Sequence, residues 1–165
     1  SGTDRIAEVA LSIQADVYVN VQGDEPLVEP GDIAACAVSL LADASVVMGS
    51  VYTACPQEEW EVPSVVKVVV DKNGDALYFS RFPVPYPRQI RSEPVKKHVG
   101  LYAYTGEVLE RFSRWPQSPL ESAESLEQLR FLENGVLIRM SPGQGSSMAV
   151  DTPEQADSVR AILDA

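Results

Sequence analysis

Segments with strand-like and helix-like patterns alternate along most of the chain, and this alternation limits the possible folds more than any other feature. Residues 16–21 form a β-branched run that ends in Gln22-Gly23-Asp24-Glu25-Pro26, as expected for a buried strand that runs into a loop. An Ala- and Leu-rich helical stretch follows at 33–42. The alternation predicts an α/β domain with a mostly parallel sheet. The other strands are expected at 45–53, 65–70, 76–80, 97–104 and 136–140, and the other helices at 1–13, 107–114, 120–133 and 152–163.

One pair of strands breaks the parallel pattern. The strands at 65–70 and 76–80 are joined by Asp71-Lys72-Asn73-Gly74-Asp75, and an Asn-Gly pair suits a hairpin turn. We therefore expect a mixed sheet with an antiparallel hairpin. The chain shows neither an internal repeat nor a change of composition, so residues 1–165 are interpreted as a single domain.

Composition excludes several classes of function. The formal net charge of −11 argues against nucleic acid or an anionic membrane as a partner, and no apolar run approaches the roughly 20 residues of a membrane span. Cys36 lies in a helical pattern and Cys55 follows a strand pattern. We interpret them as reduced thiols in the core of a cytoplasmic protein.

Two carboxylates are candidates for a metal site. Asp24 follows the first predicted strand, and ligands of open α/β sheets bind beyond the carboxyl ends of strands. Asp151 precedes the helix that begins near Thr152. Taken singly, a strand-to-turn junction explains Asp24 as well as metal binding does, and an ordinary turn or cap explains Asp151 better. Taken together they suggest Mg²⁺, because one or two carboxylates leave positions on this ion free for phosphates.

Three further polar clusters have a structural and a functional interpretation. Strand alternation places His98, the single histidine, on the same face as Gly100 and Tyr102, although a lone histidine is more often structural. The second cluster consists of Glu121, Glu124 and Glu127, which share one side of the predicted helix and normally would form a solvated face. The third is the Pro-rich loop with Arg81 and Arg88, which suits either a plain surface or the binding of a carboxylate.

Six segments of the chain form a recognisable series. The most specific of them is VNVQGDEP at 19–26. The others are SGTDR at 1–5, ALYFSR at 76–81, KHVGLY at 97–102, PLE with LEQLR at 119–121 and 126–130, and VDTPE at 150–154. The same segments occur in the same order in the 3-deoxy-manno-octulosonate (Kdo) cytidylyltransferases, or CMP-Kdo synthetases, and the chain resembles that family from end to end.

The resemblance implies a Rossmann-like nucleotidyltransferase fold and a reaction for lipopolysaccharide biosynthesis. The anomeric hydroxyl of Kdo would attack the α-phosphorus of CTP, giving CMP-Kdo and pyrophosphate. Asp24 and Asp151 would hold the catalytic Mg²⁺, and Ser1 and Gly2 would lie against the nucleotide, with Arg5 as the nearest basic side chain. The sugar-acid pocket would be lined by Gln22, Arg88, His98, Tyr102, Glu127 and Gln128.

The chain departs from the family pattern in three places. Ala149 replaces the usual glycine, and the stretch between Arg88 and Lys97 looks shortened. The first-strand region of the family and its basic triphosphate loop are missing, so the chain corresponds to the C-terminal two thirds of a member. We expect residues 1–165 alone to be inactive.

Two alternative functions remain open, and one oligomeric state is expected. A sister cytidylyltransferase for 8-amino-Kdo or sialic acid would share the chemistry, and an inactive remnant would bind a sugar acid without transferring CMP. The resemblance also suggests a homodimer. The apolar residues between Trp115 and Glu133 exceed what one helix needs for its own core, which points to this segment as the contact.

Overall fold

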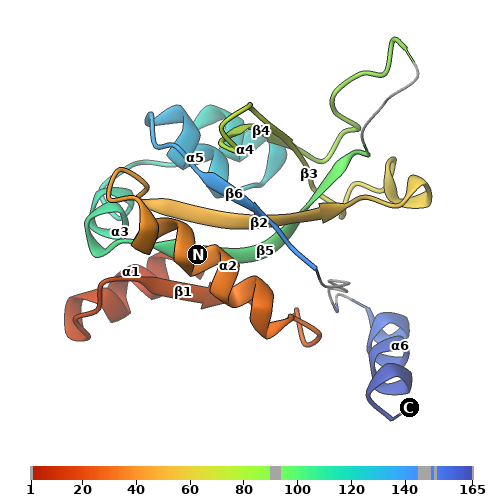
Figure 1. Ribbon diagram of the computed structural model, residues 1–165, viewed down its shortest axis with the longest axis horizontal. Coiled ribbons are helices and arrows are strands. Elements are labelled where there is room, and N and C mark those ends of the chain that lie inside the picture. Colours follow the sequence, from red (N-terminus) through yellow and green to blue (C-terminus); the bar gives the residue numbers. More distant parts are fainter. Residues whose placement is uncertain (1, 90–93, 145–149, 151, 165) are drawn as a thin grey trace.

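The computed structural model describes residues 2–89, 94–144, 150 and 152–164. Helices flank a single sheet (Figure 1). The helices are α1 (Gly2–Ser12), α2 (Pro30–Ala42), α3 (Gly106–Phe112), α4 (Pro119–Glu124), α5 (Gln128–Glu133) and α6 (Pro153–Leu163), with a short 3-10 helix at Gln57–Glu59. The strands are β1 (Tyr18–Val21), β2 (Met48–Ala54), β3 (Lys67–Val70), β4 (Ala76–Ser80), β5 (Lys96–Tyr104) and β6 (Arg139–Pro142).

The sheet is mixed, as predicted, but the pairings between its described strands are mostly antiparallel and not mostly parallel. Its strand order is β4-β3-β5-β2-β6, and β1 also pairs with β5. Strands β1, β2, β3 and β6 run in one direction, whereas β4 and β5 run in the other. Among the described strands the parallel pairing is that of β2 with β6. Strand β5 separates β2 from β1 and β3, which run in the same direction as β2, and its own pairings with these three strands are antiparallel.

Strand β5 has different neighbours along its two edges. On one edge it pairs with β2 from Lys96 to Tyr104. On the other edge β3 pairs with Lys96 and Lys97, whereas β1 pairs with residues from Leu101 to Tyr104. The carboxyl end of β1 and the amino end of β3 therefore approach each other beside residues 98–100, and we call this place the seam.

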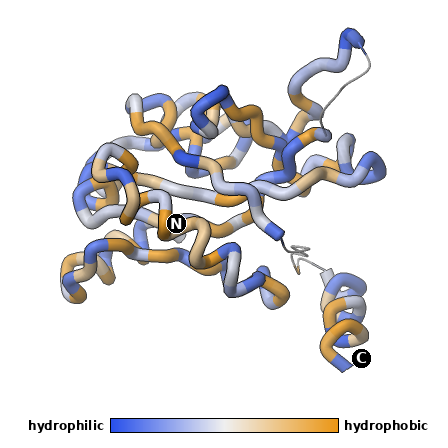
Figure 2. Tube along the Cα trace, viewed as in Figure 1, coloured by the Kyte–Doolittle hydropathy of each residue, from blue (hydrophilic) through white to orange (hydrophobic). Residues whose placement is uncertain are grey.

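Alternate residues of β5 enter two different cores. Val99, Leu101 and Ala103 pack with α2 in a small cluster on one face of the sheet. Tyr104 belongs to the larger cluster on the other face, together with apolar residues of α3 and α5. Helix α6 lies apart from these layers (Figure 1) and carries both hydrophobic and hydrophilic residues (Figure 2).

The predicted hairpin is confirmed. Gly74 takes a φ of 85°, a left-handed conformation that glycine adopts at little cost. The carboxylate of Asp71 accepts hydrogen bonds from the backbone N–H groups of Asn73 and Asp75, at 2.8 and 2.9 Å. These bonds lower the pKa of Asp71.

The prediction of one continuous helix over 120–133 is wrong. The chain turns at Ser125, whose φ is 53°, and the segment forms α4 and α5 instead. The turn allows Arg130 of α5 to reach back to Glu121 of α4, with Nε 2.6 Å from Oε2. A straight helix would place residues nine apart too far along its axis for this contact.

Apart from Leu120, which keeps 38% of its surface, the apolar residues of this segment pack in the chain's own core. Leu129 and Phe131 have no exposed surface and Leu126 retains 7%. The pattern that suggested a dimer contact is therefore explained by burial within the chain. The homodimer remains a prediction from the resemblance.

Both cysteines are free and buried, as predicted. Burial raises the pKa of Cys36 to about 12, so this thiol is unreactive near neutral pH. None of the described helices combines the length and the apolar composition needed to cross a bilayer.

Candidate functional site

A cavity of about 880 Å³ opens at the seam. It brings together residues from segments that lie far apart in the sequence, because the end of β1, the start of β3, the middle of β5 and the start of α5 meet there. Five of the predicted site residues line it: Gln22, Asp24, His98, Tyr102 and Gln128. Gly100 lies between them without a side chain, and a Cβ atom there would stand 3.4 Å from Cγ of Gln22.

The His98 ring is buried against its neighbours and keeps 9% of its surface. Its centroid lies 5.1 Å from the Phe79 ring and 5.2 Å from the Tyr102 ring. Burial lowers the pKa of His98 to about 3, so the imidazole is neutral at physiological pH. Burial, reinforced by the nearby Tyr104 and Glu127, raises the pKa of Tyr102, whose hydroxyl therefore remains a hydrogen-bond donor.

Gln128 presents an unsatisfied donor. The residue is 4% exposed, and its Nε2 atom makes no hydrogen bond with the part of the chain that the structure describes. An unsatisfied buried donor costs about 1–3 kcal/mol, which a ligand oxygen would recover. Gln128 therefore suits a ligand rich in hydroxyl groups.

Asp24 lies at the exposed rim of the cavity, and its backbone is tied to the C-terminal region. The N–H of Val150 donates to the carbonyl oxygen of Asp24 at 2.8 Å. Asp151 is the next residue in the sequence but lies outside the described residues, so the predicted carboxylate pair remains a prediction. Gly23 does not take a positive φ, and the space beside it is open.

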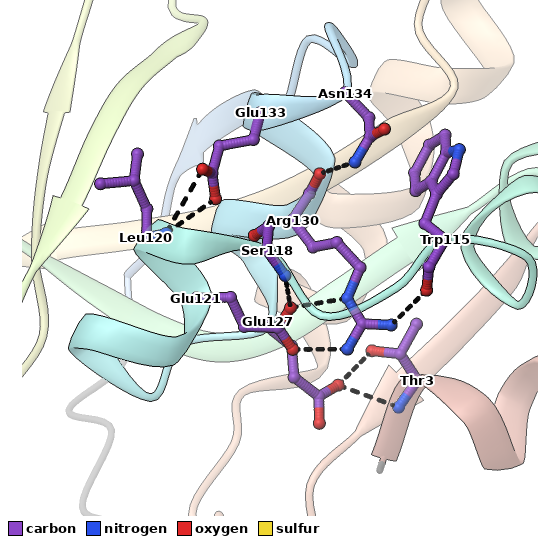
Figure 3. Close-up of polar contacts among 9 residues, drawn as sticks. All are labelled: Thr3, Trp115, Ser118, Leu120, Glu121, Glu127, Arg130, Glu133 and Asn134. Carbon is purple, nitrogen blue, oxygen red and sulfur yellow. Dashed lines mark hydrogen bonds and ion pairs between the residues drawn. The ribbon is translucent and has the colours of Figure 1, made fainter.

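A smaller hollow of about 180 Å³ shares Gln22, Tyr102 and Gln128 with the cavity and adds Gly2, Thr3 and Glu127. The carboxylate of Glu127 accepts hydrogen bonds from the Thr3 hydroxyl at 2.7 Å and from the Thr3 N–H at 3.3 Å (Figure 3). The side chain of Glu127 thus contacts the start of α1, and the resemblance places the nucleotide beside that segment. Ser1 lies outside the described residues.

Comparison with known proteins identifies relatives of this chain. Residues 1–138 match the family model described as cytidylyltransferase. The chain is 49% identical over 166 residues to the 3-deoxy-manno-octulosonate cytidylyltransferase of Chlorobium limicola, covering 98% of this chain and 67% of that protein. It is 44% identical over 163 residues to the Escherichia coli enzyme of the same name, covering 99% of this chain and 66% of that protein.

The chain belongs to the 3-deoxy-manno-octulosonate cytidylyltransferase family. It spans about two thirds of the length of these relatives. A solved structure of CMP:2-keto-3-deoxy-manno-octonic acid synthetase complexed with CTP superimposes with a TM-score of 0.93 at 43% identity, covering 99% of this chain and 68% of that one. A putative glucose-1-phosphate thymidylyltransferase from Bacillus anthracis, 14% identical with a TM-score of 0.61, covers 97% of this chain and 59% of that one and shares the fold alone.

The structure places two basic residues of the prediction outside both hollows. Arg88 lies on the exposed loop after β4, and Arg5 lies exposed on α1. Arg81 lines the cavity instead, but its guanidinium donates to backbone carbonyls, from Nε to Glu124 at 2.7 Å and from Nη1 to Pro63 at 3.0 Å. The carboxylate-binding role of Arg88 stays a prediction.

A buried ion pair holds the family motif on α4 and α5 in place. The guanidinium of Arg130 forms a two-pronged contact with Glu121, with distances of 2.6 and 2.5 Å (Figure 3). It also lies 4.1 Å above the Phe112 ring. Glu121 also accepts from the N–H of Ser118. This clamp fixes the turn that presents Glu127 and Gln128. The spacing of Ser118 and Glu121 is a capping-box signal that the periodicity argument overlooked.

Ser50 was also missed by the sequence-based reasoning. It is fully buried in β2, and its hydroxyl oxygen lies 3.1 Å from Nε2 of His98. The signal was one small polar residue inside an apolar strand, because such a hydroxyl needs a partner when it is buried.

Proposed function

We propose that the protein transfers CMP from CTP to 3-deoxy-manno-octulosonate, releasing pyrophosphate. The main support is the cavity at the seam, where Gln22, Asp24, His98, Tyr102 and Gln128 come together from three family motifs. Relatives that share 49% and 44% of the sequence bear the name of this activity. The related synthetase structure with CTP supports the nucleotide substrate.

The described polar groups suit a polyhydroxylated acid. The amides of Gln22 and Gln128 offer both donors and acceptors, and the Tyr102 hydroxyl can donate. These groups hold the acceptor sugar by neutral hydrogen bonds. Fixing the attacking hydroxyl near the nucleotide removes much of the entropic cost of bringing two substrates together.

We propose that Asp24 and Asp151 hold Mg²⁺. The exposed carboxylate of Asp24 at the cavity rim has the hard oxygen ligands that Mg²⁺ prefers. The described residues contain no group of three or more metal-binding side chains, so this chain would supply one or two carboxylates and the substrate phosphates would complete the site. When bound, the ion would neutralise phosphate charge.

The decisive experiment uses the protein as its gene encodes it. CTP, Kdo and MgCl₂ should yield CMP-Kdo, identified by mass spectrometry, together with stoichiometric pyrophosphate. A preference for 8-amino-Kdo or sialic acid would assign the protein to a sister activity. Binding of Kdo without any turnover in the presence of CTP and Mg²⁺ would contradict the proposal and favour a sugar-acid-binding remnant.

Two further properties belong to this proposal. The protein is proposed to act in the cytoplasm, which the buried free thiols of Cys36 and Cys55 support. It is also proposed to form a homodimer, as the family resemblance suggests. Cell fractionation tests the first property, and light scattering of the purified protein tests the second.

A further inference from the structure

Ser50 lies where the pairing between β2 and β5 changes register. It stands opposite Tyr102, whereas the next residue, Val51, stands opposite Val99. Two residues of β5, Gly100 and Leu101, are therefore extra at this point and form a bulge. The Ser50 hydroxyl oxygen lies 2.9 Å from the carbonyl oxygen of Leu101 and 3.1 Å from Nε2 of His98.

The hydroxyl group has one hydrogen for these two contacts. Two oxygen atoms 2.9 Å apart repel each other unless a hydrogen lies between them, so Ser50 donates to Leu101. Ser50 must then accept from His98, which requires a hydrogen on Nε2. The alternative, in which Ser50 donates to Nε2, would leave two oxygens facing each other without a hydrogen.

The imidazole carries a single N–H, and the rings packed against it hinder a flip of the imidazole ring. Its burial keeps it neutral, so a hydrogen on Nε2 leaves Nδ1 as an acceptor. The Phe79 ring meets it nearly edge-on, at an interplanar angle of 83°, and the Tyr102 ring covers it at 44°. His98 lines the cavity, and among the described residues Ser50 is the one side chain that hydrogen-bonds to the ring.

We propose that Ser50 is a positioning residue that fixes His98 in the Nε2–H tautomer, so that Nδ1 accepts a hydrogen bond from a hydroxyl group of the bound sugar acid. The identity of the ligand rests on the proposed function, whereas the tautomer does not. His98 then recognises a hydroxyl group of the substrate by accepting its hydrogen bond, and does not form an ion pair with the substrate carboxylate. A site that accepts a hydrogen bond discriminates strongly against an analogue that lacks the donor.

The first test needs no catalytic turnover. Because His98 is the single histidine of residues 1–165, its imidazole signals in ¹⁵N-histidine-labelled protein are identified as those that disappear in His98→Gln. Long-range ¹H–¹⁵N correlation spectra should show a protonated Nε2 and an unprotonated Nδ1 between pH 8 and pH 5.5. Addition of Kdo should shift the Nδ1 signal most. An Nδ1–H tautomer or a cationic ring in the free protein would overturn the proposal.

The second test compares two substitutions at one position. Ser50→Ala removes the acceptor and should increase the population of the Nδ1–H tautomer and raise the KM for Kdo about tenfold, with the KM for CTP within about twofold. Ser50→Thr keeps the hydroxyl group and should restore both the tautomer and the KM. An unchanged KM for Kdo in a folded Ser50→Ala variant would overturn the positioning role.

These results separate the inference from the proposed function. A protein without CMP-Kdo synthesis but with the Nε2–H spectrum would contradict the function and leave the tautomer assignment standing. If Ser50→Ala fails to fold, the spectrum of the unmodified protein and its response to Kdo still decide the inference.

Discussion

Thr3 and Glu127 are separated by 124 residues of sequence and are joined by a hydrogen bond of 2.7 Å. The contact links the first turn of α1 to the turn between α4 and α5 (Figure 3). The resemblance places the nucleotide beside the first segment and the sugar acid beside the second. If that placement holds, Thr3 and Glu127 connect the two halves of the proposed substrate site.

This contact should be measurable as a coupling energy. In a double-mutant cycle with Thr3→Val and Glu127→Ala, we expect a coupling of about 1 kcal/mol in the free energy of unfolding, because a charged acceptor at a helix start contributes about that much. Urea denaturation of the four proteins gives the value. Additive effects of the two substitutions would show that the hydrogen bond contributes nothing to stability.

Asp24→Asn should lower kcat by at least about 100-fold while leaving the fold intact. The side chain is exposed, so stability should change little, but the amide would hold Mg²⁺ poorly. Pyrophosphate release at saturating CTP and Kdo measures the effect. Asp16→Asn is the matched control, since Asp16 is exposed and lies before β1, outside the cavity lining. Near-normal turnover of Asp24→Asn would remove Asp24 from the proposed metal site.

Lys67→Met should destabilise the protein by about 3–5 kcal/mol. Lys67 is fully buried, and its Nζ donates to the carbonyl oxygens of Val62, Val65 and Arg81 at 3.0, 2.6 and 2.7 Å. Methionine has a similar shape but removes the Nζ donor from all three carbonyls, of which Val62 keeps a hydrogen bond from the N–H of Val65 at 3.1 Å. Chemical denaturation gives the loss, and Lys72→Met on the exposed hairpin turn serves as the control. Equal stability of the two variants would contradict the assigned role.

The stability of the protein should depend on pH through His98. In the unfolded chain this residue binds a proton below about pH 6.5, whereas in the folded protein its pKa is about 3. The unfolded state therefore binds more protons between these values, and stability falls as the pH falls. Relative to His98→Gln, the wild type should lose up to about 1.4 kcal/mol per pH unit below pH 6.5. Parallel denaturation curves at pH 7.5 and 5 test this, and an unchanged difference would contradict it.

The sequence was informative where a pattern is local. Alternation correctly placed His98, Gly100 and Tyr102 on one face of β5, and Asn73-Gly74 correctly predicted a hairpin. It was less informative where partners are distant. That β5 lies between β1 and β2 follows from packing of remote segments, so the seam had no local signal.

The helix break at Ser125 shows the same limit. The apolar spacing from Leu120 to Leu132 continues through the break, so periodicity alone extends one helix across it. The ion pair between Arg130 and Glu121 requires the turn, and its spacing of nine residues matches no helical repeat. The turn at Ser125 is therefore coupled to a buried charge pair. The periodicity of apolar residues does not reveal such a pair.

The seam divides the elements along this edge of β5 into two blocks. One block contains β1 with α1, and the other contains the β3–β4 hairpin, and each is fastened to its own half of β5. An occupant beside Gly100 takes the place that an uninterrupted neighbouring strand would fill, and it touches both blocks at once. Substrate would then act as a cross-link within the sheet. Binding of the sugar would both complete the catalytic geometry and make the sheet more rigid.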